Sequence, residues 1–464
     1  MSEADLGGLS LEQAEREIYA HILSRSPEHD FEPKLDRVLE ACTLLGDPQH
    51  AYKVIHVTGT NGKTSTARMT ESLVRAHGLR TGLFTSPHLS SVRERIAIDG
   101  EPISQEAFVR LWAEVAPFIR IVDARSADAG GPRMSFFEVL AVLAFAAFAD
   151  APVDVAVIEV GMGGIWDATN VVDADVAVIG PIALDHERWL GSSLAEIATE
   201  KAGIIKPNSV VVLAEQADTA TDVIAANLPR ARAVIREAED LEVVDRAAAV
   251  GGQLLTLRTP SATYEGVFVP LLGAHQARNA SMALAAVEAL LADGGDLQSL
   301  AGDTVEAGFA AVTSPGRLEI LRTSPTIVVD AAHNPHGIGA LVEAVEESFA
   351  FSTLVGVVAV LDDKDADGIL AGLESLLDTV VVTRSSSPRA IDPDQLARVA
   401  TTHFGEDRVV TAADVPSALD AAVQLAERDD DIGGGVLVVG SITLVADART
   451  LLGADKPSRH GARG

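Results

Sequence analysis

Runs of apolar, β-branched residues alternate along the chain with stretches rich in Ala, Leu and Glu. The runs are apolar at successive positions, which is typical of strands buried on both faces of a parallel sheet. They predict strands at 53–57, 153–160, 175–180, 209–214, 326–330, 354–360, 379–383 and 435–440. The intervening stretches predict helices that include 63–77, 136–149, 194–204, 276–293 and 335–349. Strands separated by helices predict an α/β protein with mostly parallel sheets.

The chain has 464 residues, which is more than one hydrophobic core usually holds, so two domains are expected. Two breaks in the pattern could divide them, ADGGDLQ at 292–298 and TSPGR at 313–317. The second follows a helical stretch and precedes a new strand. We therefore expect domains at 1–313 and 314–464. The polar segment from about residue 455 has no apolar periodicity and is expected to be disordered.

Charge and composition exclude several classes of protein. The chain carries 67 acidic and 36 basic residues, a net charge of −31, which argues against a nucleic-acid-binding surface. The longest apolar run, 139–149, is too short to span a bilayer, and the N-terminus lacks a signal-peptide pattern. A single cysteine, Cys42, excludes an internal disulfide and a cysteine metal cluster. We expect a cytoplasmic protein without nucleic-acid or membrane partners.

The segment HVTGTNGKTSTAR at 56–68 has the context of a phosphate-binding loop, because a predicted strand, a glycine turn and a predicted helix follow one another. Its spacing is unusual: the common loop would place a glycine at position 57, which is Val57, and the glycine comes at Gly59. Lys63 could reach the phosphates and the Thr64 hydroxyl could bind Mg²⁺. The alternative is a tight turn with a solvated lysine.

Two further side chains follow buried strands, where ligands bind in α/β sheets. Glu159 ends an apolar strand and precedes a glycine turn, and could serve the metal of the phosphate loop. The alternative is a strand-end acid that faces solvent. His186 comes after the next strand, but a histidine is an unusual partner for Mg²⁺ and is more often structural.

The loop T-G-T-N-G-K-T, with its short glycine spacing, resembles that of the ATP-dependent Mur ligase superfamily, as does DAAHNP at 330–335. The stretches TSPHL with the ERI that follows, EKAGI and PGRLE narrow the resemblance to the folate branch. The chain, from about residue 30 to 445, resembles the bacterial bifunctional dihydrofolate synthase/folylpolyglutamate synthase family. That resemblance implies an N-terminal P-loop ATPase-like domain with a mostly parallel sheet and a smaller, Rossmann-like C-terminal domain.

The resemblance also assigns roles to residues of the first domain. Gly59, Thr60, Asn61, Gly62, Lys63 and Thr64 match the ATP phosphate loop. Thr64, Ser86, Glu159 and His186 match the Mg²⁺ ligands. Lys201 matches a lysine that CO₂ carbamylates, and the alternative for it is a surface lysine paired with Glu200 or Glu196. The walls of the pterin pocket are matched by Ser135, Phe136, Phe137, Glu138, Asp167 and Ala168. The segment 34–48 either borders that pocket or is an amphipathic packing helix.

Further ATP contacts are matched by Asn279, Arg317 and Asp330. Asp330 could instead cap the helix that Pro335 opens. His333 and Ser441 resemble positions near the incoming glutamate, so that Lys63, Lys201 and His333 form the expected catalytic set. The chain departs from the family at Thr64, where glycine is common but the hydroxyl suits the metal. It also departs at Ile165 and Trp166, which follow the glycine turn where a polar group is common.

The resemblance implies an ATP-dependent ligase that activates a carboxylate as an acyl phosphate and joins it to L-glutamate. Its expected substrates are ATP, L-glutamate and dihydropteroate or a reduced folate, with Mg²⁺ as cofactor, and a monomer is expected. Three alternatives remain open: a Mur peptidoglycan ligase, a P-loop GTPase or kinase, and a non-catalytic ATP-binding regulator. The first would need an N-terminal domain before the loop, and the second fits neither the loop spacing nor a second domain.

Overall fold

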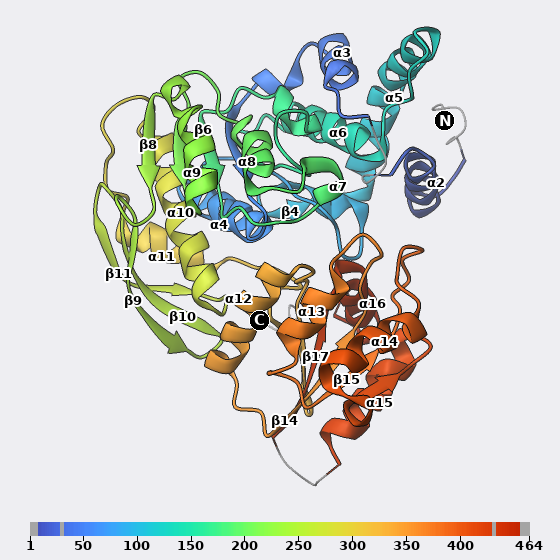
Figure 1. The fold of residues 1–464 in the computed structure, drawn as a ribbon. Coiled ribbons are helices and arrows are strands. Elements are labelled where there is room, and N and C mark those ends of the chain that lie inside the picture. The colour runs from blue at the N-terminus through green and yellow to red at the C-terminus, as the bar shows by residue number, and fades with distance from the viewer. Residues whose placement is uncertain (1–7, 28–31, 429–432, 455–464) are drawn as a thin grey trace, which may run out of the picture. The chain divides into compact units, whose positions relative to one another are not determined.

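A computed structural model describes residues 8–27, 32–428 and 433–454, so the predicted disordered tail lies outside the described residues. The chain divides into two compact units (Figure 1). The first contains Met1–Ala247, Leu254–Pro270 and Ala277–Val312. The second contains Thr313–Gly464 and two short segments, Ala248–Gln253 and Leu271–Gln276. Among the helices of the described residues, none is long and apolar enough to cross a membrane.

An eight-stranded sheet with the order β4-β3-β2-β5-β1-β6-β7-β8 forms the centre of the first unit. The strands from β2 to β8 in this order are parallel, and β3 and β4 add an antiparallel edge. The parallel register brings the carboxyl ends of β1, β5 and β6 to one edge of the sheet. The strands are Lys53–Thr58 (β1), Thr81–Phe84 (β2), Ile96–Ile98 (β3), Glu101–Pro102 (β4), Val155–Glu159 (β5), Val176–Ile179 (β6), Val210–Leu213 (β7) and Ala233–Arg236 (β8).

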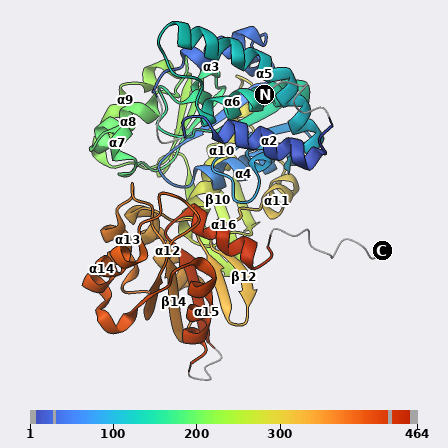
Figure 2. The ribbon, with the colours of Figure 1, turned by 90° about the vertical axis from the view of Figure 1, so that its right-hand side faces the viewer.

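Helices cover this sheet, and the most apolar of them, α6, is buried along nearly its whole length. Its Phe145 and Phe148 lie in a core that also contains Trp112 of α5. Figures 1 and 2 show α8 and α9 side by side. The helices are Leu11–Leu23 (α2), Asp36–Leu44 (α3), Lys63–Ala76 (α4), Gln105–Asp128 (α5), Phe136–Asp150 (α6), Glu187–Leu190 (α7), Leu194–Ala202 (α8), Asp218–Ala225 (α9), Ala274–Leu291 (α10) and Gly302–Ala310 (α11). Short 3₁₀ helices lie at Pro48–His50, Val92–Arg95, Ala168–Val171 and Leu228–Arg230.

A separate three-stranded sheet has the order β11-β10-β9, with strands Glu242–Ala249 (β9), Gly252–Arg258 (β10) and Thr263–Val269 (β11). Buried and exposed residues alternate along β10 and β11, because only one face of this sheet is covered. The strands of this sheet are not among those predicted from the sequence pattern.

The second unit has a six-stranded sheet with the order β12-β13-β17-β14-β15-β16. Only the pairing of β12 with β13 is antiparallel. The strands are Glu319–Thr323 (β12), Thr326–Val329 (β13), Thr353–Val358 (β14), Thr379–Val382 (β15), Val409–Thr411 (β16) and Gly434–Val439 (β17). The helices are Pro335–Ser348 (α12), Ala366–Leu373 (α13), Pro393–Phe404 (α14), Val415–Ala426 (α15) and Ile442–Leu451 (α16), with a 3₁₀ helix at Glu406–Arg408.

The predicted fold class is therefore confirmed, with a mostly parallel sheet in the first unit and a Rossmann-like sheet in the second. Each strand and helix predicted by range is present, with ends that differ by at most a few residues. The 24-residue helix α5 is not among the predicted helices. Pro117 lies inside α5, where a proline normally argues against a helix.

Candidate active site

The phosphate-loop segment connects β1 to α4, as predicted. Gly62 stands at the N-cap of α4 with φ +79°, a backbone conformation that favours glycine. A Cβ atom at Gly62 would lie 2.7 Å from Oδ1 of Asn279, so Asn279 of α10 lies directly against the loop. The Thr60 hydroxyl donates to the Ala183 carbonyl and accepts from the Ala183 N–H, both at 3.0 Å. These bonds tie the loop to the segment that follows β6.

Two lysines meet at one carbonyl oxygen of this loop. Nζ of Lys63 donates to the Gly59 carbonyl at 3.1 Å and to the Thr60 carbonyl at 3.0 Å. Nζ of Lys201, from α8, donates to the same Gly59 oxygen at 2.8 Å. The interpretation of Lys201 as a surface lysine is therefore wrong, since the residue is only 4% exposed. Lys63 is likewise bonded and partly buried, which excludes the solvated-lysine alternative.

Burial changes the acid–base chemistry of Lys201. Desolvation, with a smaller contribution from the nearby Lys63 ammonium, lowers the pKa of Lys201 to about 7. A substantial fraction of this amine is therefore neutral near neutral pH. A neutral amine is a nucleophile, whereas an ammonium is not.

Glu159 ends β5 at the same edge of the sheet and is 1% exposed, so the alternative of a solvent-facing acid is wrong. Its Oε1 accepts from the Thr64 hydroxyl at 2.9 Å, and its Oε2 accepts from the Ser86 N–H at 3.2 Å. Three residues predicted as metal ligands, from β5, α4 and the loop after β2, are thus brought together.

A small pocket opens beside this cluster. It is lined by Gly59, Thr60, Lys63, Gly161, Met162, Gly163, Asp185, His186, Leu190 and Lys201. His186 has φ 53°, a left-handed conformation that is uncommon for a residue other than glycine. Its N–H donates to the Asp185 carboxylate at 2.8 Å. The pocket therefore combines the phosphate loop, both lysines and the predicted histidine within the first unit.

The glycine turn after β5 packs closely on its neighbours. A Cβ atom at Gly161 would lie 2.4 Å from the ring of Phe137, and one at Gly164 would lie 2.3 Å from the Glu200 carbonyl. The Ile165 N–H donates to that same Glu200 carbonyl at 3.0 Å. The turn thus fixes α8, and with it Lys201, against the end of β5.

Asp167 organises the loop that follows this turn. Its carboxylate accepts from the Met162 N–H at 2.8 Å, and from the N–H and the hydroxyl of Thr169 at 2.9 and 2.5 Å. The Thr169 hydroxyl also lies 2.8 Å from Nε2 of His56, which is fully buried in β1. The neighbouring Ala168 is buried as well. Neither His56 nor Thr169 is predicted from the sequence: only the fold brings His56 to Thr169, whereas Thr169 lies two residues from Asp167.

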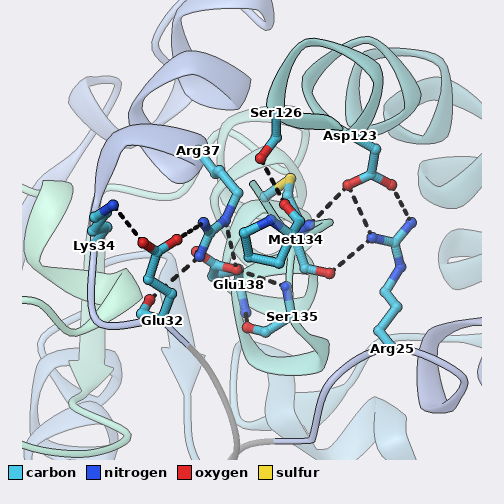
Figure 3. A network of polar contacts seen from close by, with 10 residues as sticks. Arg25, Glu32, Lys34, Arg37, Asp123, Ser126, Met134, Ser135 and Glu138 are labelled. Atoms are coloured by element: carbon cyan, nitrogen blue, oxygen red, sulfur yellow. Dashed lines mark hydrogen bonds and ion pairs between the residues drawn. The ribbon is translucent and has the colours of Figure 1, made fainter. Parts of the chain in front are cut away.

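Ser135 and Glu138 form a capping box at the start of α6, as Figure 3 shows. The Ser135 hydroxyl accepts from the Glu138 N–H at 3.2 Å, and the Glu138 carboxylate accepts from the Ser135 N–H at 2.6 Å. The Phe137 ring packs against Phe84 at 5.7 Å between centroids. Phe136 lies under the guanidinium of Arg95 at 5.1 Å. This segment therefore presents two fixed aromatic rings, and that of Phe137 lies against the glycine turn at Gly161.

In the second unit, Asp330 follows β13 and binds backbone groups on both sides. Its carboxylate accepts from the N–H groups of Leu318 and Ala332, each at 2.8 Å. It does not cap α12, because the cap is Asn334, whose side chain accepts from the Gly337 N–H at 2.8 Å. The capping alternative for Asp330 is therefore wrong.

The other predicted residues of the second unit lie on the same sheet. Nδ1 of His333 is 2.9 Å from the Ala331 carbonyl oxygen, and the Arg317 guanidinium donates to the carbonyl of the preceding residue at 3.2 Å. Ser441 follows β17 and caps α16, and its hydroxyl is buried. Because β13 and β17 are adjacent and parallel, His333 and Ser441 both follow carboxyl ends at one edge of this sheet.

Comparisons with known proteins agree with this geometry. The Mur ligase middle domain matches residues 118–287, and the Mur ligase glutamate ligase domain matches residues 316–442. A dihydrofolate synthase/folylpolyglutamate synthase of Mycobacterium tuberculosis (strain H37Rv) is 50% identical over 94% of this chain and 93% of its own. This chain belongs to the dihydrofolate synthase/folylpolyglutamate synthase family of Mur ligases.

Solved structures extend the comparison with the family. M. tuberculosis folylpolyglutamate synthase in complex with ADP and AMPPCP has a TM-score of 0.91 and 48% identity, over 97% of this chain and 100% of its own. Escherichia coli FolC in complex with DHPP and ADP has a TM-score of 0.80 and 29% identity, over 96% and 98%. The predicted resemblance to the folate branch of the Mur ligases is confirmed, and the chain is an ATP-dependent ligase.

The side-chain oxygen atoms around Glu159 suit a hard cation such as Mg²⁺. Mg²⁺ prefers oxygen ligands, keeps several waters and needs only one or two carboxylates. Glu159 supplies a carboxylate, and Thr64 supplies a hydroxyl that already bonds to it. Among the described residues, no group of three or more His, Cys, Asp or Glu side chains could hold a metal ion on such protein ligands alone. The residues therefore fit a cation that shares its coordination with phosphate and water, as a nucleotide-bound Mg²⁺ does.

Proposed function

We propose that this chain is a bifunctional ligase that adds L-glutamate to dihydropteroate and to the γ-carboxylate of folates. Membership of the dihydrofolate synthase/folylpolyglutamate synthase family supports this assignment. The observation that carries it is the cluster of Lys63, Lys201 and Glu159 around the Gly59 carbonyl and the end of β5. In such a cluster, the lysine ammonium can stabilise the negative charge of a phosphoryl group during its transfer, and the carboxylate can bind a cation.

The first step transfers the γ-phosphoryl group of ATP to the carboxylate of the pterin substrate, which gives an acyl phosphate and ADP. Lys63 and the N-terminus of α4 stabilise the charge of the transferring group. Thr64, Ser86, Glu159 and His186 would hold Mg²⁺, which neutralises phosphate charge when bound. Asn279, Arg317 and Asp330 are proposed to contact ATP.

The second step forms the amide. The amine of L-glutamate attacks the carbonyl carbon of the acyl phosphate, the C–N bond forms, inorganic phosphate leaves with the electrons of the C–O bond, and the nitrogen loses a proton. We place His333 and Ser441 near this glutamate, and Phe136, Phe137 and Ala168 at the pterin. Asp167 and the Ser135–Glu138 capping box would shape the same wall.

Lys201 is proposed to act as a carbamate. Its neutral amine would attack CO₂, form an N–C bond and release a proton, which turns a neutral side chain beside Lys63 into an anion. The lowered pKa of Lys201, caused first by burial, supports this chemistry. We also propose that the enzyme works in the cytoplasm as a monomer, and its net charge of −31 disfavours self-association.

The test is release of phosphate from ATP with Mg²⁺ and L-glutamate, with dihydropteroate, tetrahydrofolate or a Mur-type nucleotide sugar as the carboxylate donor. Release with both pterins is expected. Release with tetrahydrofolate alone would restrict the function to a folylpolyglutamate synthase. Release with the nucleotide sugar and neither pterin would overturn the proposal.

A further inference from the structure

Two buried arginines hold the segment that leads into α6, and the mechanism above does not use them (Figure 3). Arg25 follows α2, and Arg37 lies on α3. Their side chains are only 2% and 8% exposed. A buried guanidinium needs partners for its donors, so the partners show what each arginine holds.

Arg25 fixes the backbone of Met134. Its guanidinium makes two bonds to the Asp123 carboxylate of α5, at 3.3 and 2.9 Å, and donates to the Met134 carbonyl at 2.9 Å. The same Asp123 carboxylate accepts from the Met134 N–H at 2.8 Å. Both polar backbone groups of Met134 are therefore held by one ion pair.

Arg37 holds the first turn of α6 through Glu138. Its guanidinium donates to the two oxygens of Glu138 at 3.0 and 3.4 Å, and to Glu32 at 3.1 Å. Glu138 in turn accepts from the Ser135 N–H, while the Phe136 N–H donates to the Ser26 carbonyl at 2.9 Å. The N–H groups of Met134, Ser135 and Phe136 are thus bonded to Asp123 and Glu138, which are partners of the two arginines, and to Ser26, the residue after Arg25.

Capping of the helix alone does not require such a network. Helix α8 begins with the same kind of capping box, formed by Ser193 and Glu196 at an exposed position. Among the described residues, Glu196 is bonded only within that box. A buried ion pair is also a poor source of net stability, because two charges must be desolvated. The two arginines therefore indicate that the start of α6 must be held in a defined position.

The segment that the two arginines hold contacts the lining of the pocket. The Phe137 ring lies where a Cβ atom at Gly161 would be, and Gly161 lines the pocket together with Lys63 and Lys201. A shift of the Ser135–Phe137 segment would therefore move the aromatic wall relative to the phosphate loop. Displacements of about 1 Å can cost a reaction about a hundredfold in rate.

We infer that Arg25 and Arg37 are positioning residues for the carboxylate donor, which hold Ser135–Phe137 where this wall receives the pterin. The inference rests on the proposed function, since it takes that segment as the pterin wall. Neither arginine touches the substrate; each acts through Met134 or Glu138.

The test compares steady-state constants of four variants with the wild type. Arg37→Met combined with Glu138→Gln, and Arg25→Met combined with Asp123→Asn, remove both charges of each pair and so leave no buried charge unpaired. Arg37→Lys keeps a charge but loses the two-pronged geometry. Arg125→Met is the matched control, because it breaks an exposed ion pair with Glu40 that joins α5 and α3 away from the wall.

We expect KM for dihydropteroate to rise about tenfold in each double variant while KM for ATP changes less than about twofold. Arg37→Lys should fall between the double variant and the wild type, and Arg125→Met should match the wild type. Thermal unfolding of each variant shows whether it is folded. An unchanged KM for dihydropteroate in folded double variants, or an equal rise in both KM values, would overturn the inference. A wild type that uses the nucleotide sugar and neither pterin would instead overturn the proposed function, and the inference with it.

Discussion

At the scale of single residues, Lys201 shows how burial alters one side chain. Its pKa falls to about 7 chiefly because the charged form is desolvated. The unfolded chain then binds more protons than the folded protein between about pH 7 and the ordinary lysine pKa of 10.5. Stability from this group therefore rises with pH across that window, and the full cost of burying the charge is present below pH 7.

Lys201→Met should remove this dependence. In CO₂-free buffer, the wild type should gain stability from pH 7 to pH 10 through Lys201, and the variant should lack this gain. The free energy of unfolding of the variant minus that of the wild type should therefore become less positive over this range, by up to several kcal/mol. Chemical denaturation at both pH values measures it. Lys206→Met is a graded comparison, because burial also lowers the pKa of this less buried lysine, so its pH profile should change in the same direction but less. Parallel pH profiles for Lys201→Met and the wild type would contradict the lowered pKa.

Glu159→Gln tests the metal cluster. Glutamine can still accept the Thr64 hydroxyl but lacks the charge that a cation needs. We expect turnover to fall at least about a hundredfold, with little recovery at high Mg²⁺. Phosphate release at increasing Mg²⁺ measures both effects, and a chelator should abolish wild-type turnover. The exposed acid Glu106, changed to Gln, is the control. Near-normal turnover of Glu159→Gln would remove it from the metal site.

At the scale of elements, the glycine turn at 161–164 fixes two neighbours at once. Gly164→Ala would push a methyl group to 2.3 Å from the Glu200 carbonyl, so α8 must shift. We expect a loss of about 1–3 kcal/mol in stability and a large loss of turnover, since Lys201 moves with α8. Gly339→Ala in α12 meets no atom within 4 Å and should stabilise by about 0.5–1 kcal/mol. Denaturant titration compares them. Wild-type activity in Gly164→Ala would show that the turn does not position Lys201.

The elements also show where sequence is informative. Strands buried on both faces are continuous apolar runs, so β1, β5 and β6 are predictable, and with them the residues that follow their carboxyl ends. Helix α5 is hidden by Pro117, and β9–β11 have only short alternating patterns. The predicted site residues Thr64 and Glu159 are found because Thr64 lies in the first turn of α4 and Glu159 is the last residue of β5. No role is predicted for His56, Arg25 or Arg37, because their partners are set by packing between elements distant in sequence. Arg37 does lie in the segment 34–48, which is expected to border the pocket or to pack as a helix.

At the scale of the whole molecule, the net charge of −31 is the dominant property. Like charges repel one another more strongly in the folded chain than in the expanded one. The midpoint of thermal unfolding should therefore rise by a few degrees between about 20 and 200 mM NaCl. The effect should shrink towards the isoelectric point near 4.6, which provides an internal control. A midpoint that falls with salt at neutral pH would contradict this expectation.

The carbonyl oxygen of Gly59 accepts hydrogen bonds from both Lys63 and Lys201. If either lysine is substituted, the Gly59 carbonyl oxygen loses one of its two donors and is bound by the remaining lysine alone. The effect of a change at one position therefore depends on the residue at the other, which is epistasis in evolutionary terms. Among related sequences, the residues at positions 63 and 201 should consequently be correlated with each other.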